Sequence, residues 1–208
     1  MNTARLVLPL ALLLLSALQA PAAIITYTDR TAFLANLTSL FENDFESLAL
    51  GSITSPQSFS ANGFSYQVSS DSVLYVVDTS GDQSLAENTL PNGLGFLNLS
   101  ANIWGLGGYF FYNLGTSIAN GGGTLTATNA ANETANLSVT NPANTTTFFG
   151  FLSTSGPLTS VTFTEAFSNR GFLNVDDLIV GNNVPEPATF ALTAAALAAA
   201  GLLRRRRA

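Results

Sequence analysis

Residues 158–164 read LTSVTFT, and residues 135–140 read ANLSVT. In the first stretch the apolar Val161 and Phe163 alternate with threonines, and the second stretch alternates in the same way. Successive side chains of a β-strand point to opposite faces, so this alternation indicates strands with one buried and one solvated face. Such strands are typical of an antiparallel sandwich, in which each sheet packs one face on the core.

Similar short runs, rich in β-branched and aromatic residues, fill the sequence between residues 64 and 180. Gly, Asn, Pro and Asp separate the runs, as they separate strands in all-β domains. The predicted strands cover residues 64–68, 73–77, 94–99, 103–113, 123–130, 135–140, 145–152, 158–164 and 171–180. No helical pattern of about 10–15 residues lies between them, which disfavours a parallel βαβ fold.

A short helix is predicted before the first of these strands, over residues 29–37. Thr28 or Asp29 can serve as its N-cap, and Phe33, Leu34 and Leu37 fall on one face at helical spacing. The expected fold class is therefore all-β: an antiparallel β-sandwich with a short N-terminal helix.

Three absences in the composition narrow the possible functions. The 208 residues include no cysteine and no histidine, and the basic residues are all arginine. Without cysteine the chain forms no disulfide, thiolate nucleophile or iron–sulfur cluster. Without histidine it builds no Ser-His-Asp or Cys-His catalytic group, and without lysine it forms no Schiff base. Charged residues amount to only 10%, and small polar residues take their place, as in many secreted β-rich proteins.

The N-terminus has the features of a secretory signal peptide, predicted over residues 1–22. An arginine gives the positive start, and the apolar run 6–18 is shorter than a membrane span of about 20 residues. The small residues 20–22 follow as the cleavage pattern. The mature chain is therefore expected to begin near Ala23 or Ile24.

The C-terminus combines an apolar run with a cationic end. Residues 190–203 carry no charge and are mostly Ala and Leu, and Arg204, Arg205, Arg206 and Arg207 follow them. The run is apolar on all sides, which disfavours an amphipathic core helix and predicts a transmembrane helix. Positive charge beside a span stays on the cytoplasmic side, so the domain before it is expected outside.

Val184, Pro185, Glu186 and Pro187 stand just before this run. A Pro-Glu-Pro triplet, an apolar helix and an arginine cluster, in this order, resemble the PEP-CTERM sorting signal of Gram-negative bacteria. The resemblance implies processing by an exosortase, a transpeptidase-like membrane protease, at the Pro-Glu-Pro motif, and the predicted signal peptide makes signal peptidase the second processing enzyme. It further implies a transient stay in the inner membrane, then a place on the cell surface or in the extracellular matrix, in association with exopolysaccharide.

The sequence thus divides into a signal peptide over 1–22, a β-sandwich domain over 24–181 and a sorting signal over 182–208, with 181–184 as the linker. Between residues 24 and 183 there are twelve acidic residues and two arginines, a net charge of −10. A nucleic-acid partner is disfavoured, because no basic patch is available to neutralise phosphates. The acid excess fits soluble export and the binding of divalent cations.

Two acidic motifs lie near the ends of the domain, NDFESLALG over residues 43–51 and GFLNVDDLIVG over residues 171–181. They resemble jelly-roll carbohydrate-binding modules and galactose-binding-like sandwiches, whose first and last strands run side by side and hold a structural calcium ion. The resemblance implies a jelly-roll-like sandwich with Glu46 and Asp176 or Asp177 as calcium ligands. These acids are not a complete set, because calcium takes about six to eight oxygens. Solvated acids at a strand end are the alternative interpretation.

Aromatic residues have two possible roles in such a domain. The sequence holds fifteen phenylalanines and one tryptophan, and core packing is the favoured role for them. Carbohydrate sites also use exposed rings that stack on sugar faces, and Trp104, Tyr109 and Tyr112 are the candidates for such a platform. Alternation places Tyr109 and Tyr112 on opposite faces of one strand, so the three rings are not expected to serve one purpose.

Three functions remain open from the sequence. The favoured one is a non-enzymatic surface protein that binds carbohydrate or associates with exopolysaccharide. The second is a glycoside hydrolase that uses two carboxylates, for which Glu46, Glu87, Glu133 and Glu165 are the candidate acids. The third is a structural matrix or adhesion protein without a saccharide site.

Overall fold

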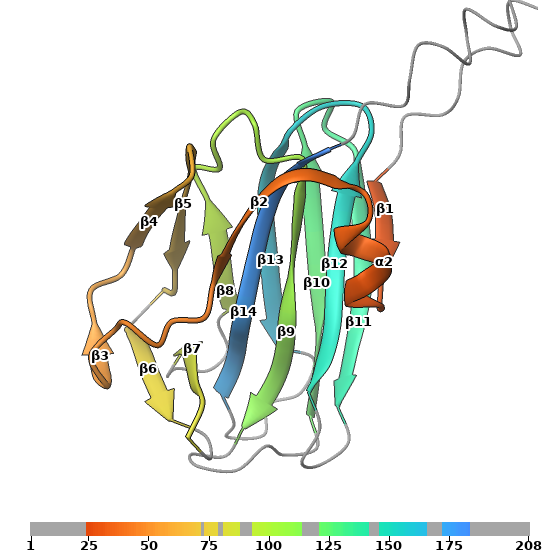
Figure 1. Cartoon of the computed structure of the whole chain (residues 1–208). Coiled ribbons are helices and arrows are strands. Elements are labelled where there is room, and N and C mark those ends of the chain that lie inside the picture. The colour runs from red at the N-terminus through yellow and green to blue at the C-terminus, as the bar shows by residue number, and fades with distance from the viewer. Residues whose placement is uncertain are drawn as a thin grey trace, which may run out of the picture. The chain divides into compact units, whose positions relative to one another are not determined.

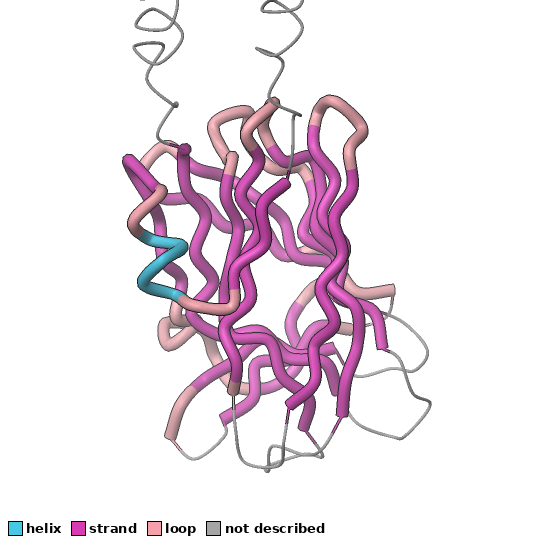
Figure 2. The backbone as a smooth tube through the Cα atoms, turned by 90° about the vertical axis from the view of Figure 1, so that its right-hand side faces the viewer, coloured by secondary structure: helices cyan, strands magenta, loops and turns pink. Residues whose placement is uncertain are grey.

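The computed structural model describes residues 24–71, 73–78, 81–87, 93–113, 121–141, 146–165 and 172–183. They belong to one unit, Ala23–Asn183, in which two antiparallel sheets face each other (Figures 1 and 2). The predicted antiparallel β-sandwich is therefore confirmed. The signal peptide predicted over 1–22 and the motif, apolar helix and arginines predicted over 184–207 lie outside the described residues. Within the described ranges, no helix is long and apolar enough to cross a membrane.

The eight-stranded sheet, here called sheet A, has the order β1-β12-β9-β14-β7-β6-β3, and β2 also pairs with β14. Its strands are β1 (Ile24–Tyr27), β2 (Leu37–Asn43), β3 (Gly51–Ile53), β6 (Leu74–Asp78), β7 (Gln83–Glu87), β9 (Gly105–Asn113), β12 (Thr147–Ser153) and β14 (Phe172–Asn183). The longest strand, β14, lies in the middle of this sheet and has paired strands along both of its sides.

The six-stranded sheet, here called sheet B, has the order β11-β10-β13-β8-β5-β4. Its strands are β4 (Gln57–Ala61), β5 (Phe64–Ser69), β8 (Gly93–Leu97), β10 (Gly121–Asn129), β11 (Thr134–Asn141) and β13 (Leu158–Glu165). Val161 and Phe163 of β13 are fully buried, whereas Thr162 and Thr164 point away from the core. The alternation that predicted a half-buried strand is confirmed here.

Each predicted strand is present within a few residues of its expected ends, and five further strands, β1, β2, β3, β4 and β7, were not predicted. The helix α2 spans Arg30–Leu34 rather than 29–37, with the Asp29 carboxylate accepting a hydrogen bond from the Ala32 N–H at 2.8 Å. The prediction was wrong at the C-terminal side because Leu37 already belongs to β2, whose pairing with β14 overrides helical spacing. Residues 181–183, expected to be linker, are the last residues of β14 for the same reason.

Strand β14 has two partners on the same side, one after the other along its length. Its first half pairs with β7 through Asn174 and Val175, and its second half pairs with β2 from Leu178 to Asn183. A β-bulge separates the two halves, and Asp177 adopts a positive φ of 46° there. The bulge breaks the strict alternation of side chains at Asp176 and Asp177.

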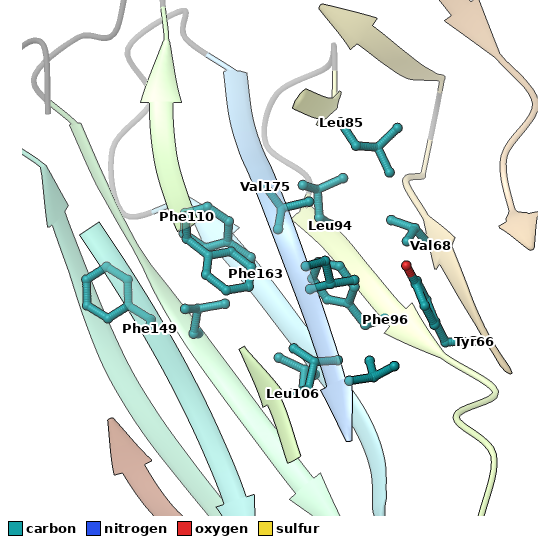
Figure 3. Close-up of a cluster of buried hydrophobic side chains, with 14 of the residues drawn as sticks. Tyr66, Val68, Leu85, Leu94, Phe96, Leu106, Phe110, Phe149, Phe163 and Val175 are labelled. Atoms are coloured by element: carbon teal, nitrogen blue, oxygen red, sulfur yellow. The ribbon is translucent and has the colours of Figure 1, made fainter. Parts of the chain in front are cut away.

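The space between the sheets is filled mainly by aromatic and aliphatic side chains (Figure 3). Phe110 of sheet A packs edge-to-face on Phe96 and Phe163 of sheet B, with ring centroids 5.9 and 5.5 Å apart. Edge-to-face pairs at this spacing are favourable beyond the area that they bury. Core packing, the favoured role for the phenylalanines, is confirmed for these rings.

A second apolar cluster lies on the outer side of sheet A, where α2 covers the strands (Figures 1 and 2). Phe33 of α2 is fully buried and packs on Phe148 and Tyr27, with ring centroids 5.4 and 5.6 Å away. The sheet beneath it carries glycines at positions 105, 107, 150 and 181, where an added Cβ would meet neighbouring atoms at 2.7–3.0 Å. These glycines let the helix and β2 approach the backbone of sheet A closely.

Candidate functional site

The bulge in β14 brings the two predicted acidic motifs together. Glu46 follows β2 and accepts a hydrogen bond from the Gln83 N–H at the start of β7, at 2.6 Å. Asp176 accepts one from the N–H of its neighbour Asp177 at 2.7 Å. Both carboxylates therefore bind backbone N–H groups at the point where β14 changes partner. Asp44 acts in a similar way by accepting from the Glu46 N–H at 3.2 Å.

Burial and like charges make this an unfavourable place for negative charge. Asp176 is 8% exposed, and burial, followed by the charges of Asp82, Asp177 and Glu46, raises its pKa to about 7. Burial and the charges of Glu42 and Asp82 also raise the pKa of Asp177, and the Arg30 guanidinium opposes them. A bound cation would relieve this accumulation of charge.

Oxygen donors of this kind have the chemistry that calcium prefers. The structure brings Glu46 close enough to Asp176 for their charges to interact. Nevertheless, among the described residues no three acidic side chains converge on one possible ion position. Calcium at Glu46, Asp176 and Asp177 therefore stays a prediction.

The three aromatic candidates for sugar stacking are not brought together. Trp104 lies just before β9 and is half-buried, and Tyr109 is half-buried against Phe148 on the outer side of sheet A, 5.9 Å between ring centroids. Tyr112 is 3% exposed inside the sandwich, where its hydroxyl donates to Glu165 at 2.9 Å. The ring of Tyr112 is thus unavailable to a sugar, and these residues form no platform.

The four candidate glutamates for hydrolysis do not form an accessible pair either. Glu46 and Glu165 have the structural partners just described, and Glu133 accepts hydrogen bonds from Asn129 and Ser155, which lower its pKa. Glu87 is 1% exposed, and burial and the charges of Glu165 and Asp71 raise its pKa to about 8. A polysaccharide chain has no access to a carboxylate buried in this way.

The outer side of sheet B presents a regular array of polar side chains. We call it the uncharged face. Its members are hydroxyl or amide side chains that alternate with the core residues of β4, β5, β10, β11 and β13, whereas β8 contributes the exposed Leu97. They are Ser58, Ser60, Ser65, Gln67, Ser69, Thr124, Thr126, Thr128, Thr134, Asn136, Ser138, Thr140, Ser160, Thr162 and Thr164.

Strand register lines these side chains up in rows. Thr126 of β10 lies opposite Asn136 on one side and Thr162 on the other, and the Thr126 hydroxyl donates to the Asn136 side chain at 2.7 Å. Neighbouring strands lie about 4.8 Å apart, and alternate residues along a strand about 7 Å apart, so the rows form a regular grid. Glycines at 93 and 95 of β8 continue two of the rows without a side chain.

None of the outward-pointing residues described on this face is charged, although the sequence from 24 to 183 carries a net charge of −10. The described acids lie on sheet A, in the turns or between the sheets. The uncharged face was not predicted from the sequence. Alternation in the strands predicted only which side of each strand is buried. The residues on the solvated side of each strand were themselves the signal, since Ser, Thr and Asn stand there in place of Lys and Glu.

Comparison with known proteins indicates the cellular destination of the protein. Residues 183–207 match the PEP-CTERM protein-sorting motif, as the resemblance implied. The motif implies processing by an exosortase and export to the cell envelope or surface of a bacterium. The match covers the end of the chain and not the sandwich.

Two solved structures are similar to the sandwich. One is the solution structure of CtCBM11, with 15% identity and a TM-score of 0.34 over 69% of this chain and 94% of that one. The other is the family 11 carbohydrate-binding module of the cellulosomal cellulase Lic26A-Cel5E of Clostridium thermocellum, with 14% identity and a TM-score of 0.34 over 72% and 99%. No curated protein matches the sequence. The fold assignment rests on the strand pairing rather than on these likenesses.

Proposed function

We propose that this protein is an exported, non-enzymatic surface domain that binds neutral polysaccharide through the uncharged face of sheet B. The observation that carries the proposal is the segregation of charge: an exposed face of hydroxyl and amide groups in a strongly acidic domain. Export and processing by an exosortase follow from the sorting motif, and signal peptidase is the proposed second processing partner. The proposed ligand is exopolysaccharide at the surface of a Gram-negative host.

The chemistry of the face suits a neutral sugar polymer. Hydroxyl and amide groups both donate and accept hydrogen bonds, as sugar hydroxyls do. An uncharged ligand loses no favourable ion hydration when it binds there, whereas an anionic polymer is repelled by the acids elsewhere on the domain. Binding through many weak contacts along a grid fits a long chain, since neighbouring sites on one polymer act together.

The proposal is tested by affinity gel electrophoresis of the purified protein in gels that contain dextran, mixed-linkage β-glucan, alginate or the exopolysaccharide of the host. We expect retardation by at least one neutral polymer and by the host material. T126K and T162K place a long cationic side chain in the middle of the face, and each is expected to reduce retardation several-fold.

S39K is the matched control, because Ser39 is exposed on β2 of sheet A, away from the uncharged face. It is expected to bind like the unmodified protein. Absence of retardation by every polymer contradicts the proposal, as does an equal loss in S39K and T162K. Retardation by alginate alone assigns binding to a different, cationic or metal-bridged site.

We also propose that the acids at the β14 bulge bind calcium, on the strength of the buried Asp176 and its acidic neighbours. Equilibrium dialysis against calcium measures the number of bound ions. D176N is expected to bind one ion fewer than the unmodified protein. An unchanged count in D176N contradicts a calcium ion at the bulge.

A further inference from the structure

Glu87 is a buried acid without a partner. It ends β7, two positions after the core residue Leu85, so its side chain lies on the inner side of sheet A. The side chain is 1% exposed, and neither carboxylate oxygen has a hydrogen-bond partner among the described residues. A buried charge in such a position is costly unless it is paired, bound to a metal or protonated.

A second carboxylate approaches the same place from the other sheet. Glu165 ends β13 and follows Val161 and Phe163 on the inner side of sheet B. The hydroxyl of Tyr112, on β9, donates to it across the interior at 2.9 Å. Glu165 therefore lies against sheet A, at the end where β9 finishes.

The strand register places Glu87 at this same end. β14 begins beside the end of β9, with Phe172 opposite Asn113 (lower end in Figure 1). β7 pairs with the same part of β14, since Ala86 lies opposite Asn174. The charges of Glu165 and of the exposed Asp71, in the turn before β6, both act on Glu87, so negative charge from three segments gathers at this end of the sandwich.

The described part of the chain offers no positive side chain to balance it. Arg30 is the basic residue that the structure describes, and it is engaged with Glu42 on the outside of the sandwich at 2.6 Å. A single proton neutralises one of the two carboxylates and leaves the other charged. A divalent ion balances the charge of both and gives the oxygens of Glu87 a partner.

We infer that Glu87 and Glu165 bind a divalent metal cation between the two sheets. Two carboxylates with hard oxygen atoms are suitable ligands for calcium or magnesium, and main-chain carbonyls and water complete such sites. The ion joins β7 of sheet A to β13 of sheet B and stabilises this end of the sandwich. The site is separate from the acids at the β14 bulge and does not depend on polysaccharide binding.

The inference is tested on the purified full chain in mild detergent at about pH 8, with EDTA, CaCl2 or MgCl2 as the only variable. One of the two ions is expected to raise the melting temperature by about 5 °C or more when in large excess over its dissociation constant. E87Q, which keeps the size of the side chain and removes its charge, is expected to remove the part of this shift that the ion at Glu87 contributes and to leave the part that the bulge acids contribute. E165Q is expected to reduce it.

Equilibrium dialysis separates this site from the bulge and from a general effect on folding. E87Q is expected to bind one ion fewer than the unmodified protein, whereas D176N keeps the ion at Glu87. E87Q is also expected to retain its retardation in polysaccharide gels, so the two proposals fail independently. The inference is overturned if neither ion shifts the melting temperature, or if E87Q keeps the full shift and ion count; a shared proton is then the remaining explanation.

Discussion

Asn129, the last residue of β10, joins two turns of the sandwich through one buried side chain. It is completely buried, and its amide nitrogen lies 2.8–3.0 Å from oxygens of Glu133, Ser153 and Ser155. Its amide oxygen accepts from the N–H groups of Ala131 and Glu133 at 3.0 Å. N129A leaves these groups unpaired, and we expect the free energy of unfolding to fall by about 2–3 kcal/mol in urea titrations.

Asn136 is the matched comparison for Asn129, because it is the same residue type on the exposed side of β11. N136A removes its hydrogen bond from Thr126 in a place where water replaces it. We expect a change of no more than about 0.5 kcal/mol. Equal losses in N129A and N136A would show that burial of the network does not matter.

Glu87 makes stability depend on pH in the absence of metal. Its pKa of about 8 in the folded protein lies above the ordinary value of 4.5, because burial, then Glu165 and Asp71, disfavour the charged form. The stability that the proton contributes is complete below about pH 4.5 and is lost as the pH rises through about 8. In EDTA, the melting temperature should fall between about pH 5 and 9, and E87Q should flatten part of that fall. The raised pKa values of Asp176 and Asp177 contribute to the remaining slope. A profile unchanged by E87Q rules out Glu87 as its source.

At the level of elements, the contact of α2 with sheet A depends on glycine. A Cβ added to Gly150 would lie 3.0 Å from the Phe33 ring and 3.1 Å from the Phe148 ring, so G150A forces both rings to move. Overpacking of this kind costs about 1–3 kcal/mol. We expect G150A to lower the melting temperature, and the loss to be smaller when Phe33 is already changed to leucine, because the two sites are coupled.

G156A is the control for this prediction. Gly156 is also buried, but an added Cβ would meet the nearest atom, on Ala130, at an ordinary 3.5 Å. Its melting temperature should stay close to that of the unmodified protein. A larger loss in G156A than in G150A would contradict the role of close packing under α2.

At the scale of the whole molecule, the sequence predicted the strands whose side chains alternate between core and solvent. It did not predict features that depend on contacts between strands far apart in the sequence. The strands of sheet B were predictable because their core and solvent sides differ in every second residue. β7 was missed because its residues Ser84 to Glu87 are all buried, polar ones included, so no alternation is visible. Glu87 itself was named only as a possible acid. The surroundings of its carboxylate depend on β13 of the other sheet. No local pattern of residues 83–87 reveals that contact.

The two processing steps predicted from the ends of the chain leave the described sandwich intact. β1 begins at Ile24, at the expected start of the mature chain, and β14 ends at Asn183, just before Pro185. Mass spectrometry of the protein from its host should therefore find an N-terminus at Ala23 or Ile24 and a C-terminus without Arg204–Arg207.

Replacing residues 185–187 by alanine should preserve the tail, because it removes the motif at which the exosortase acts. If the unmodified protein keeps Arg204–Arg207, the prediction of exosortase cleavage is contradicted, and the tail is then a plain membrane anchor. The processed form should melt at the same temperature as the unprocessed one, since both cuts fall outside every described strand.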